Sequence, residues 1–470
     1  MFRSALCTLL MVIGPAAFAP GQTARFIRTE LGSRFQVNAT NVMGNYAYAS
    51  LKGGNFFVGM ADNGDYVVAW YGKNDGDVFK RAFNANGTPK DTFDVLVSTY
   101  TASEQRPLAL GVGRNGTYDI AWGSYFQNTA SPPWSAASLL ARGYNADGTD
   151  RYGPTMLWES QANEHAATGS RYAVSAALFN TGNTNDGALI VARHSQHYYY
   201  GFKVTQAGAT TTPYNVQFST YGWTSFGDGG GAVALADSGH GVVLGGGGYP
   251  QDPLTARARY WIYNNTAGTF AGGGGGSAAY GTWVNAQGKD VSAGGIRVKN
   301  WRCDVAMNGS GTGVMVWVIN SESNTVNYNN GQLDIAARRF ALSGTTLSFR
   351  DSDPWLVNQD TNRDQFAPRV AIDDLGRFIV AWQDDDTNIY ARVFNDDGTG
   401  LDQFVVNPPP TSTNDWYGAV DVAAVRDYVD SLRFVIAYGY TPSNSINRGY
   451  NLYAQPGWAV VPKGTIIHIR

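Results

Sequence analysis

Acidic clusters are the residues whose type and spacing first suggest chemistry in this chain. Asp384, Asp385 and Asp386 stand in a row, and Asp351 and Asp353 form a smaller group. Carboxylate oxygens on loops are ligands that Ca²⁺ prefers. The chain has no D-x-D-x-D-G loop followed by a distal Glu, so a solvated acidic loop stays the alternative. We therefore expect no cofactor, with Ca²⁺ at the row of three aspartates as the metal hypothesis.

The histidines and the glycine runs do not match a catalytic motif. His194 and His197 lie three residues apart, and in a strand such side chains point to opposite faces. The His-Glu-x-x-His, Gly-x-Ser-x-Gly and phosphate-loop patterns are all missing from the sequence. A pair of carboxylates for glycoside hydrolysis stays open, because the chain has 37 acidic residues. The catalytic residues are thus unknown, and the sequence favours a protein that is not an enzyme.

Long insertions supply aromatic side chains that suit sugar stacking or protein contact. Four of them are the predicted ligand-binding residues: Trp134, Tyr249, Tyr280 and Tyr328. They lie in the insertions 124–137, 249–255, 271–280 and 320–333. The alternative is that these are long surface loops without a ligand.

A repeated unit must position these loops, and residues 365–407 show it best. The segment contains four short apolar runs, which we name a to d, rich in Val, Ile, Phe, Tyr and Trp. Gly, Asn or Asp separates the runs, which is typical of strands joined by hairpin turns. The Asp397-Gly398-Thr399 turn between runs c and d recurs at Asn86 and Asp147. The unit therefore predicts a small antiparallel sheet.

The same order of runs recurs along the chain. A four-stranded unit of this size, repeated in tandem, is typical of a β-propeller. We therefore expect an all-β, seven-bladed propeller of four-stranded antiparallel blades, folded as a single domain over 25–470. The blades are expected at 51–99, 104–160, 171–220, 229–286, 301–358, 364–407 and 419–470.

The last unit lacks a clear run d, and the chain termini offer two candidates for it. Residues 34–38 (RFQVN) resemble the run d of 404–407, so this strand would close the ring. The tail 464–470 is the alternative. Closure removes exposed sheet edges, and it would stabilise a ring that has no disulfide.

Two residues recur at fixed places in the unit, and repetition favours a structural role. A Trp ends run b in four units, as Trp70, Trp122, Trp317 and Trp382. We expect this ring to fill the space between blades. An Arg in run c recurs as Arg81, Arg142, Arg338 and Arg392, and we expect it to make an ion pair or a backbone contact between blades.

The pattern Q-x-x-P-x-V-A, G-x-F-V-V-A-W, D-I-Y-A-R-x-F and F-x-V-N resembles a tandem repeat common in secreted bacterial proteins of propeller type. Residues 365–407 carry it best, and the units near 51–99, 104–160 and 301–358 carry most of it. The resemblance implies a secreted or surface repeat protein, and no particular reaction comes with it.

The N-terminus predicts export. Residues 1–24 have one Arg, an apolar run from 5 to 13 and small residues after it, as in a secretory signal peptide. The run is too short to span a membrane, and no later stretch is apolar enough to do so. Cys7 would leave with the signal, so Cys303 would be a single thiol, buried in an apolar strand.

Composition limits the partners. The net charge is −3 with 15% charged residues, which argues against a nucleic-acid partner. We expect a non-catalytic binding or structural protein that is secreted or at the cell surface, with the periplasm also open. Its partners would be a protein, a glycan or further copies of itself. The alternatives are a carbohydrate-active hydrolase or lyase with its site at the axial mouth, and a Ca²⁺-dependent adhesin.

Overall fold

The computed structural model describes most of the chain between Phe26 and Val460 and contains only strands and connections. The described residues are 26, 28–40, 56–72, 76–101, 105–125, 137–159, 174–178, 187–193, 199–205, 207–209, 232–247, 257–266, 269–271, 303–320, 333–384, 388–410, 415–426, 431–441 and 451–460. Within them, no helix has the length and apolar character that a membrane crossing needs.

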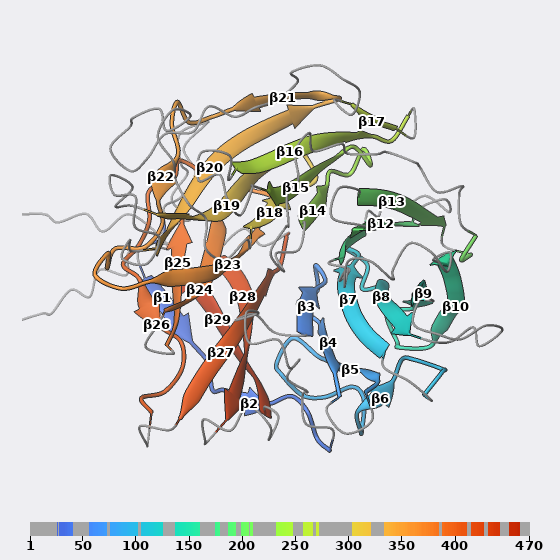
Figure 1. Ribbon diagram of the computed structural model, residues 1–470. Helices are drawn as coiled ribbons and strands as arrows, with labels where there is room; N and C mark the ends of the chain where they lie inside the picture. The colour runs from blue at the N-terminus through green and yellow to red at the C-terminus, as the bar shows by residue number, and fades with distance from the viewer. Residues whose placement is uncertain are drawn as a thin grey trace, which may run out of the picture.

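Six antiparallel sheets of four or five strands form the blades (Figure 1). Blade 1 contains β3 (Phe56–Met60), β4 (Tyr66–Tyr71), β5 (Val78–Phe83) and β6 (Val95–Leu96). Blade 2 contains β7 (Gln105–Val112), β8 (Tyr118–Tyr125), β9 (Ala137–Tyr144) and β10 (Asp150–Glu159). Blade 3 contains β14 (Ala232–Leu235), β15 (Gly241–Gly247), β16 (Arg257–Asn264) and β17 (Thr269–Ala271).

The C-terminal half holds the other three blades. Blade 4 contains β18 (Cys303–Met307), β19 (Thr312–Asn320), β20 (Leu333–Ser343), β21 (Thr346–Phe349) and β22 (Trp355–Leu356). Blade 5 contains β23 (Gln365–Ile372), β24 (Phe378–Asp384), β25 (Ile389–Phe394) and β26 (Phe404–Val405). Blade 6 contains β27 (Trp416–Ala424), β28 (Ser431–Thr441), β29 (Asn451–Val460), β1 (Arg28–Leu31) and β2 (Phe35–Gln36).

The expectation of seven four-stranded blades is wrong. Six sheets have four strands or more, whereas the unit expected at 171–220 forms a sheet of three strands in the described part of the chain. These strands are β11 (Val174–Leu178), β12 (Gly187–Arg193) and β13 (Tyr199–Thr205). The run d expected at 215–218 lies outside the described residues.

The first strand of every sheet lies innermost, so the sheets stand around a common axis (Figure 1). Each first strand contacts that of the next sheet, and β27 of blade 6 contacts β3 of blade 1, which completes the ring. The three-stranded sheet lies between blades 2 and 3. Stacking of this kind buries both faces of each sheet.

The N-terminal segment joins the last sheet. β2 pairs with β29 through Phe35 and Ala454, and β1 pairs with the same strand further along. The closing strand expected at 34–38 is therefore present, although β1 was not expected. The alternative tail 464–470 and the signal segment 1–24 lie outside the described residues.

The apolar core lies in the seams between sheets. Each large cluster of buried side chains draws on two or more neighbouring sheets, such as blades 4 and 5. Trp70, Trp122 and Trp382 are fully buried and Trp317 nearly so, which confirms the structural role predicted for this repeated ring. Cys303 is also buried.

Candidate functional site on the ring axis

Of the residues predicted as ligand-binding or metal-binding, the structure describes Asp384. Trp134, Tyr249, Tyr280 and Tyr328 lie outside the described residues, as do Asp385 and Asp386. Asp384 is described: its buried carboxylate accepts the backbone N–H of Asn388 at 2.7 Å. In the described ranges, no three His, Cys, Asp or Glu residues gather as metal ligands.

The repeated Arg of run c makes a backbone contact across the seam, which confirms that interpretation for three of its copies. Their Nη1 atoms donate to a valine carbonyl of the preceding blade at 2.8–3.0 Å: Arg81 to Val37, Arg142 to Val97 and Arg392 to Val357. Val37 follows the closing strand β2, so the closing seam carries the same link as an ordinary one. Arg338 instead bonds the carbonyls of Asp351 and Ser352 in its own blade.

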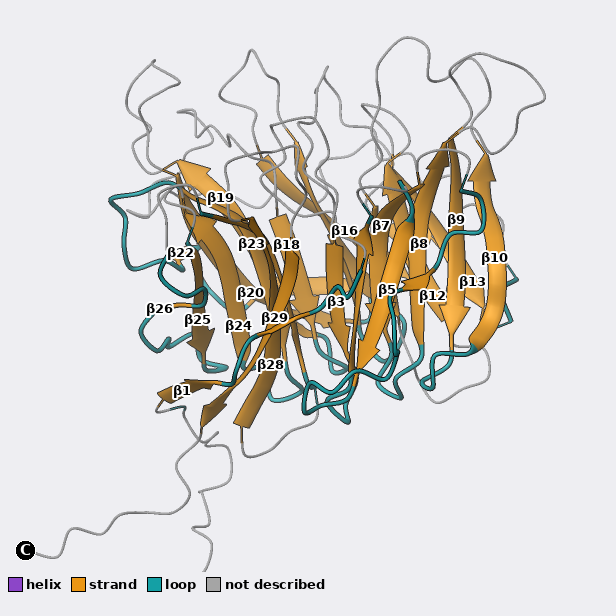
Figure 2. Cartoon of the chain, turned by 90° about the horizontal axis from the view of Figure 1, so that it is seen from below, coloured by secondary structure: helices purple, strands orange, loops and turns teal. Residues whose placement is uncertain are grey.

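Tight turns gather at one end of the ring (Figure 2, lower side). Here Arg114 of blade 2 joins carboxylates from three other blades. Its Nε lies 2.8 Å from Asp62 of blade 1, and its Nη1 lies 3.0 Å from Asp237 of blade 3. Its Nη2 bonds Asp374 of blade 5. A single guanidinium therefore ties four blades together across the axis at this end.

These residues occupy one repeated place, the second position of the turn that follows each innermost strand. Backbone bonds link the turns: the N–H of Asp62 bonds the carbonyl of Arg114 and that of Asp374 bonds the carbonyl of Arg426. In blade 4 the position is Gly309, where a Cβ would lie 2.1 Å from a carboxylate oxygen of Asp237. Only glycine lets that carboxylate reach Arg114.

A second layer, five residues before this turn position, carries a different set of charges. It contains Asp304 of β18, Arg369 of β23 and Asp421 of β27. At about 3.3 Å per residue it lies roughly 16 Å up the strands from the turn layer. The position between the layers holds Gly or Ala in all six blades: Gly59, Gly111, Ala234, Ala306, Ala371 and Ala423. Small side chains there allow the innermost strands to approach one another.

We call the second layer, with Asp304, Arg369 and Asp421, the axial layer. Each of its two carboxylates accepts a backbone N–H group from the next blade. Asp421 Oδ2 accepts from Val58 at 2.7 Å, and Asp304 Oδ2 accepts from Val370 at 2.9 Å. Arg369 Nε lies 3.7 Å from Asp421 Oδ1, and it has no hydrogen-bond partner in the described part of the chain. That ion pair is too long for a hydrogen bond.

Strained backbone precedes two members of this layer. Ala367 and Ala419 have φ of 52° and 54°, the two positive-φ residues other than glycine in the described ranges. Each lies in a β-bulge of an innermost strand, two residues before Arg369 or Asp421. A bulge re-aims the side chains that follow it, so both charged residues owe their direction to it.

Burial raises the pKa of Asp421 to about 6, against the opposing effects of Arg369 and the Val58 N–H. The nearby charge of Asp304 raises the pKa further. This carboxyl group therefore titrates close to neutral pH, where an ordinary aspartate is fully ionised.

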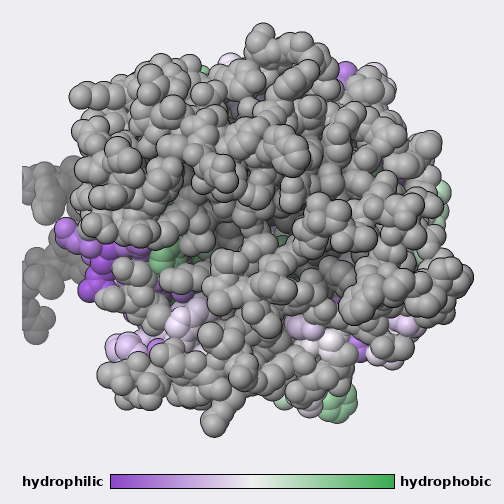
Figure 3. Space-filling model, viewed as in Figure 1, coloured by the Kyte–Doolittle hydropathy of each residue, from purple (hydrophilic) through white to green (hydrophobic). Residues whose placement is uncertain are grey.

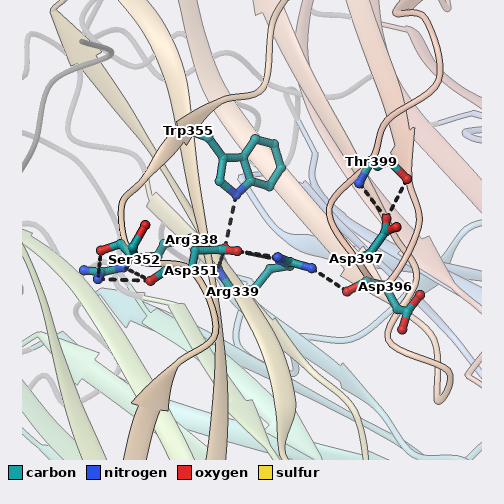
Figure 4. Close-up of polar contacts among 8 residues, drawn as sticks. All are labelled: Arg338, Arg339, Asp351, Ser352, Trp355, Asp396, Asp397 and Thr399. Carbon is teal, nitrogen blue, oxygen red and sulfur yellow. Dashed lines mark hydrogen bonds and ion pairs between the residues drawn. The ribbon is translucent and has the colours of Figure 1, made fainter. Parts of the chain in front are cut away.

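A second Arg–Asp pair, Arg339 and Asp351, lies in blade 4 away from the axis, and we call it the rim pair (Figure 4). Unlike Arg369 and Asp421, its two side chains are hydrogen-bonded to each other. Asp351 Oδ2 accepts the backbone N–H of Arg339 at 2.7 Å and the indole N–H of Trp355 at 3.1 Å. Arg339 Nε bonds Asp351 Oδ1 at 3.0 Å, and its Nη1 bonds the carbonyl of Asp396 in blade 5 at 2.6 Å. This pair fastens a seam.

Sequence reasoning missed the axial layer because it searched for motifs and insertions. A signal was available in the aligned repeats. The position five residues before the turn is Phe57, Ala109 or Ala232 in blades 1 to 3, and it is charged in blades 4 to 6. A charge at a repeated strand position that is elsewhere apolar marks a departure from the structural pattern.

Comparison with known proteins gives the fold. No family model matches the chain, and no curated protein sequence matches it. A lectin structure from Burkholderia pseudomallei is 10% identical, with 88% of this chain and 99% of the lectin covered at a TM-score of 0.51. An α-L-arabinofuranosidase from Fusarium graminearum is 10% identical, with 90% and 98% covered at a TM-score of 0.46. At such low identity the likeness shows only that the chain is an all-β propeller.

Proposed function

We propose that this chain is an exported, non-catalytic binding propeller that takes a glycan or a surface protein at the end of the ring opposite Arg114. Export rests on the signal-like segment 1–24. The lectin fold neighbour supports a binding role, since it shows that such a ring can serve as a scaffold for sugar recognition.

The observation that carries this proposal is the difference between the two ends of the ring. The cluster around Arg114 closes one end with side chains from four blades. The insertions join strand ends at the other end: β8 to β9, β15 to β16 and β19 to β20. Ligand-binding residues of a rigid scaffold are found preferentially on such loops.

The axial carboxylates have a structural use. Asp304 and Asp421 each accept a backbone N–H from the next blade, so both fasten seams between innermost strands.

A binding assay with matched variants tests the proposal. Trp134→Ala and Tyr280→Ala remove predicted aromatic contacts, and each should weaken binding in a glycan array and in cell-surface binding by about tenfold. Leu375→Ala is the control, because Leu375 is exposed in a turn beside the closed end. Equal binding by all three variants, or no binding by the wild type, contradicts the proposal.

A carbohydrate-active hydrolase or lyase is the second candidate, and Asp421 favours it. A carboxyl group that titrates near pH 6 beside a second carboxylate is suited to general acid–base work. Release of reducing ends or of unsaturated sugars from polysaccharides, abolished in Asp421→Asn, would replace the binding proposal by this one.

A further inference from the structure

We propose that Asn86 and Asn115 are sites of spontaneous deamidation, in which the side-chain amide is converted to a carboxylate at the closed end of the ring. This inference goes beyond the proposed binding function and does not depend on it. Four Asn-Gly pairs lie in the described part of the chain, beginning at Asn63, Asn86, Asn115 and Asn308. Because the dipeptide is the same in all four, the contacts of each asparagine decide which of them reacts.

The reaction uses the backbone nitrogen of the glycine that follows the asparagine. At Asn86, the nitrogen of Gly87 loses its proton and bonds Cγ of Asn86, the Cγ–Nδ2 bond breaks, and Nδ2 leaves with that proton as ammonia. Water then opens the cyclic imide at one of its two carbonyls and gives aspartate or isoaspartate. Glycine favours the attack because it has no Cβ to shield its nitrogen.

The turns at Asn63, Asn86 and Asn115 have the same backbone, which makes these three pairs comparable. The glycine that follows each asparagine has φ of 87°, 84° and 86°, respectively. Its N–H donates to the carbonyl three residues earlier, at 2.9, 2.8 and 3.0 Å. All three asparagines are exposed. Each turn must open locally before its glycine nitrogen can attack, so a difference in rate must come from the asparagine side chains.

The side-chain bonds of Asn86 and Asn115 favour the reaction. Oδ1 of Asn86 accepts the N–H and the hydroxyl of Thr88, at 3.0 and 2.7 Å. Oδ1 of Asn115 accepts the same two groups of Thr117, at 3.1 and 2.8 Å. Donors at this oxygen stabilise the negative charge that it gains when Cγ is attacked. Within the described ranges neither Nδ2 makes a hydrogen bond, so no contact retains the leaving group.

The side-chain bonds of Asn63 and Asn308 oppose it. Nδ2 of Asn63 donates to Oδ2 of Asp65 at 2.7 Å, which retains the leaving group, and its Oδ1 accepts the N–H of Asp65. Asn308 is 1% exposed, and its Nδ2 donates to the carbonyls of Asp373 and Asp374 in the next blade, at 3.3 and 3.2 Å. Both residues should therefore keep their amides while the protein is folded.

The aspartate product fits this turn, because other blades already contain it. Asp147 of blade 2 has the place of Asn86, and its Oδ1 accepts the N–H and the hydroxyl of Thr149 at 3.0 and 2.6 Å. Asp397 of blade 5 makes the same two bonds to its own threonine. The bonds from Thr149 lower the pKa of Asp147, so a carboxylate in this turn is ionised at neutral pH.

Both sites lie at the closed end of the ring. Asn115 directly follows Arg114, whose guanidinium joins the blades there. The turn of Asn86 is bonded to the neighbouring turn, since the N–H of Ala85 donates to Oδ1 of Asp65 at 3.0 Å. Each conversion therefore adds one negative charge to this end, which becomes more acidic as the protein ages.

Incubation of the folded full-length protein in heavy-oxygen water at neutral pH, followed by peptide mapping, tests the proposal. The heavy isotope labels a carboxylate that forms during the incubation. Asn86 and Asn115 should gain the label, whereas Asn63 and Asn308 should stay unlabelled. In urea all four should react, because the contacts that separate them are lost. Equal labelling of Asn63 and Asn86 in the folded protein, or no labelling of Asn86 and Asn115, would overturn the proposal.

Exchange of the residue after the glycine gives matched variants. Asp65→Thr gives Asn63 the neighbour that Asn115 has, and Thr117→Asp gives Asn115 the neighbour that Asn63 has. The first should speed labelling of Asn63 and the second should slow labelling of Asn115, each by about fivefold, the rate equivalent of one hydrogen bond of about 1 kcal/mol. Asn86 is the internal reference for Thr117→Asp. Unchanged rates in both variants would reject the role of the side-chain contacts.

Discussion

The axial pair Arg369–Asp421 and the rim pair Arg339–Asp351 use the same two residue types at similar burial. In each pair one carboxylate oxygen accepts a backbone N–H at 2.7 Å. At the rim, the guanidinium of Arg339 bonds the carboxylate of Asp351 (Figure 4). The carboxylate also accepts the indole N–H of Trp355, and the guanidinium also donates to a carbonyl of the next blade. On the axis they stand 3.7 Å apart. The completeness of hydrogen bonding, and not residue type, separates the fastened seam from the candidate site.

The difference appears in the acidity of the two aspartates. Burial raises the pKa of both aspartates. For Asp421 this effect exceeds the opposing effects of Arg369 and the backbone N–H groups, so its pKa is raised. At the rim, bonds from Arg339 and Trp355 outweigh burial and lower the pKa of Asp351 below its ordinary value. A buried carboxylate with complete bonding is stabilised as an anion, whereas one with incomplete bonding retains its proton more readily.

Truncation of the two aspartates to alanine should give the largest difference in unfolding free energy between the two pairs. Asp351→Ala leaves a buried guanidinium, an indole N–H and a backbone N–H without their acceptor, so it should cost about 3 kcal/mol of unfolding free energy. Asp421→Ala removes one backbone bond and a long ion pair and should cost about 1 kcal/mol. Urea unfolding measures both, and equal costs would show that the axial pair is as tightly bonded as the rim pair.

The pH dependence of stability should have opposite signs at the two sites. The folded pKa of Asp421, about 6, exceeds its unfolded value of 3.8, so its contribution is complete below pH 3.8 and is lost as the pH rises through 6. Asp351 has a lowered folded pKa, so its contribution is present above pH 3.8 and is lost as the pH falls through that lowered value.

Unfolding curves between about pH 3 and pH 7 measure this difference. Asp421→Asn should gain up to about 3 kcal/mol relative to wild type at pH 7 and gain nothing at low pH. Asp351→Asn should lose stability at pH 7 and approach wild type in acid. Parallel curves for the two variants would contradict the assignment.

A third pair sharpens the comparison and should give the smallest effect. Asp91 of blade 1 accepts the N–H of Ala82 at 2.7 Å, as Asp351 does from Arg339, but its partner is Lys80, 3.2 Å away. Burial lowers the pKa of Lys80, which lies over the rings of Tyr118 and Tyr144. Lys80→Met should change the free energy of unfolding by only about 1 kcal/mol, because it removes a buried ammonium whose desolvation offsets much of its attraction to Asp91, while Asp91 is 17% exposed and keeps the N–H of Ala82. A calorimetric melt checks this, and Arg339→Met should destabilise far more.

The repeat pattern predicts the strands well because strand, turn and packing signals agree in each unit. The turn at Asp397-Gly398 and the closing strand at 34–38 were both readable from side-chain types. The hairpin of β20 and β21 was not, because the repeated unit 365–407 has only the turn between runs c and d at this place. The axial residues were not predicted, because the only signal for them is a difference between repeats. Their direction also depends on the bulges at Ala367 and Ala419, and alanine is not a residue type that indicates a positive φ.

The pairing of β1 with β29 has a mechanical consequence. Arg28 lies opposite Val460, so the two chain ends leave the sheet side by side at the same edge of blade 6. A pulling force applied between the termini would load that first pair of residues and then the next, one after another. The ring should therefore unzip at low force from this edge. A force along the strands of another blade would instead load all hydrogen bonds between two strands at once and would have to be higher.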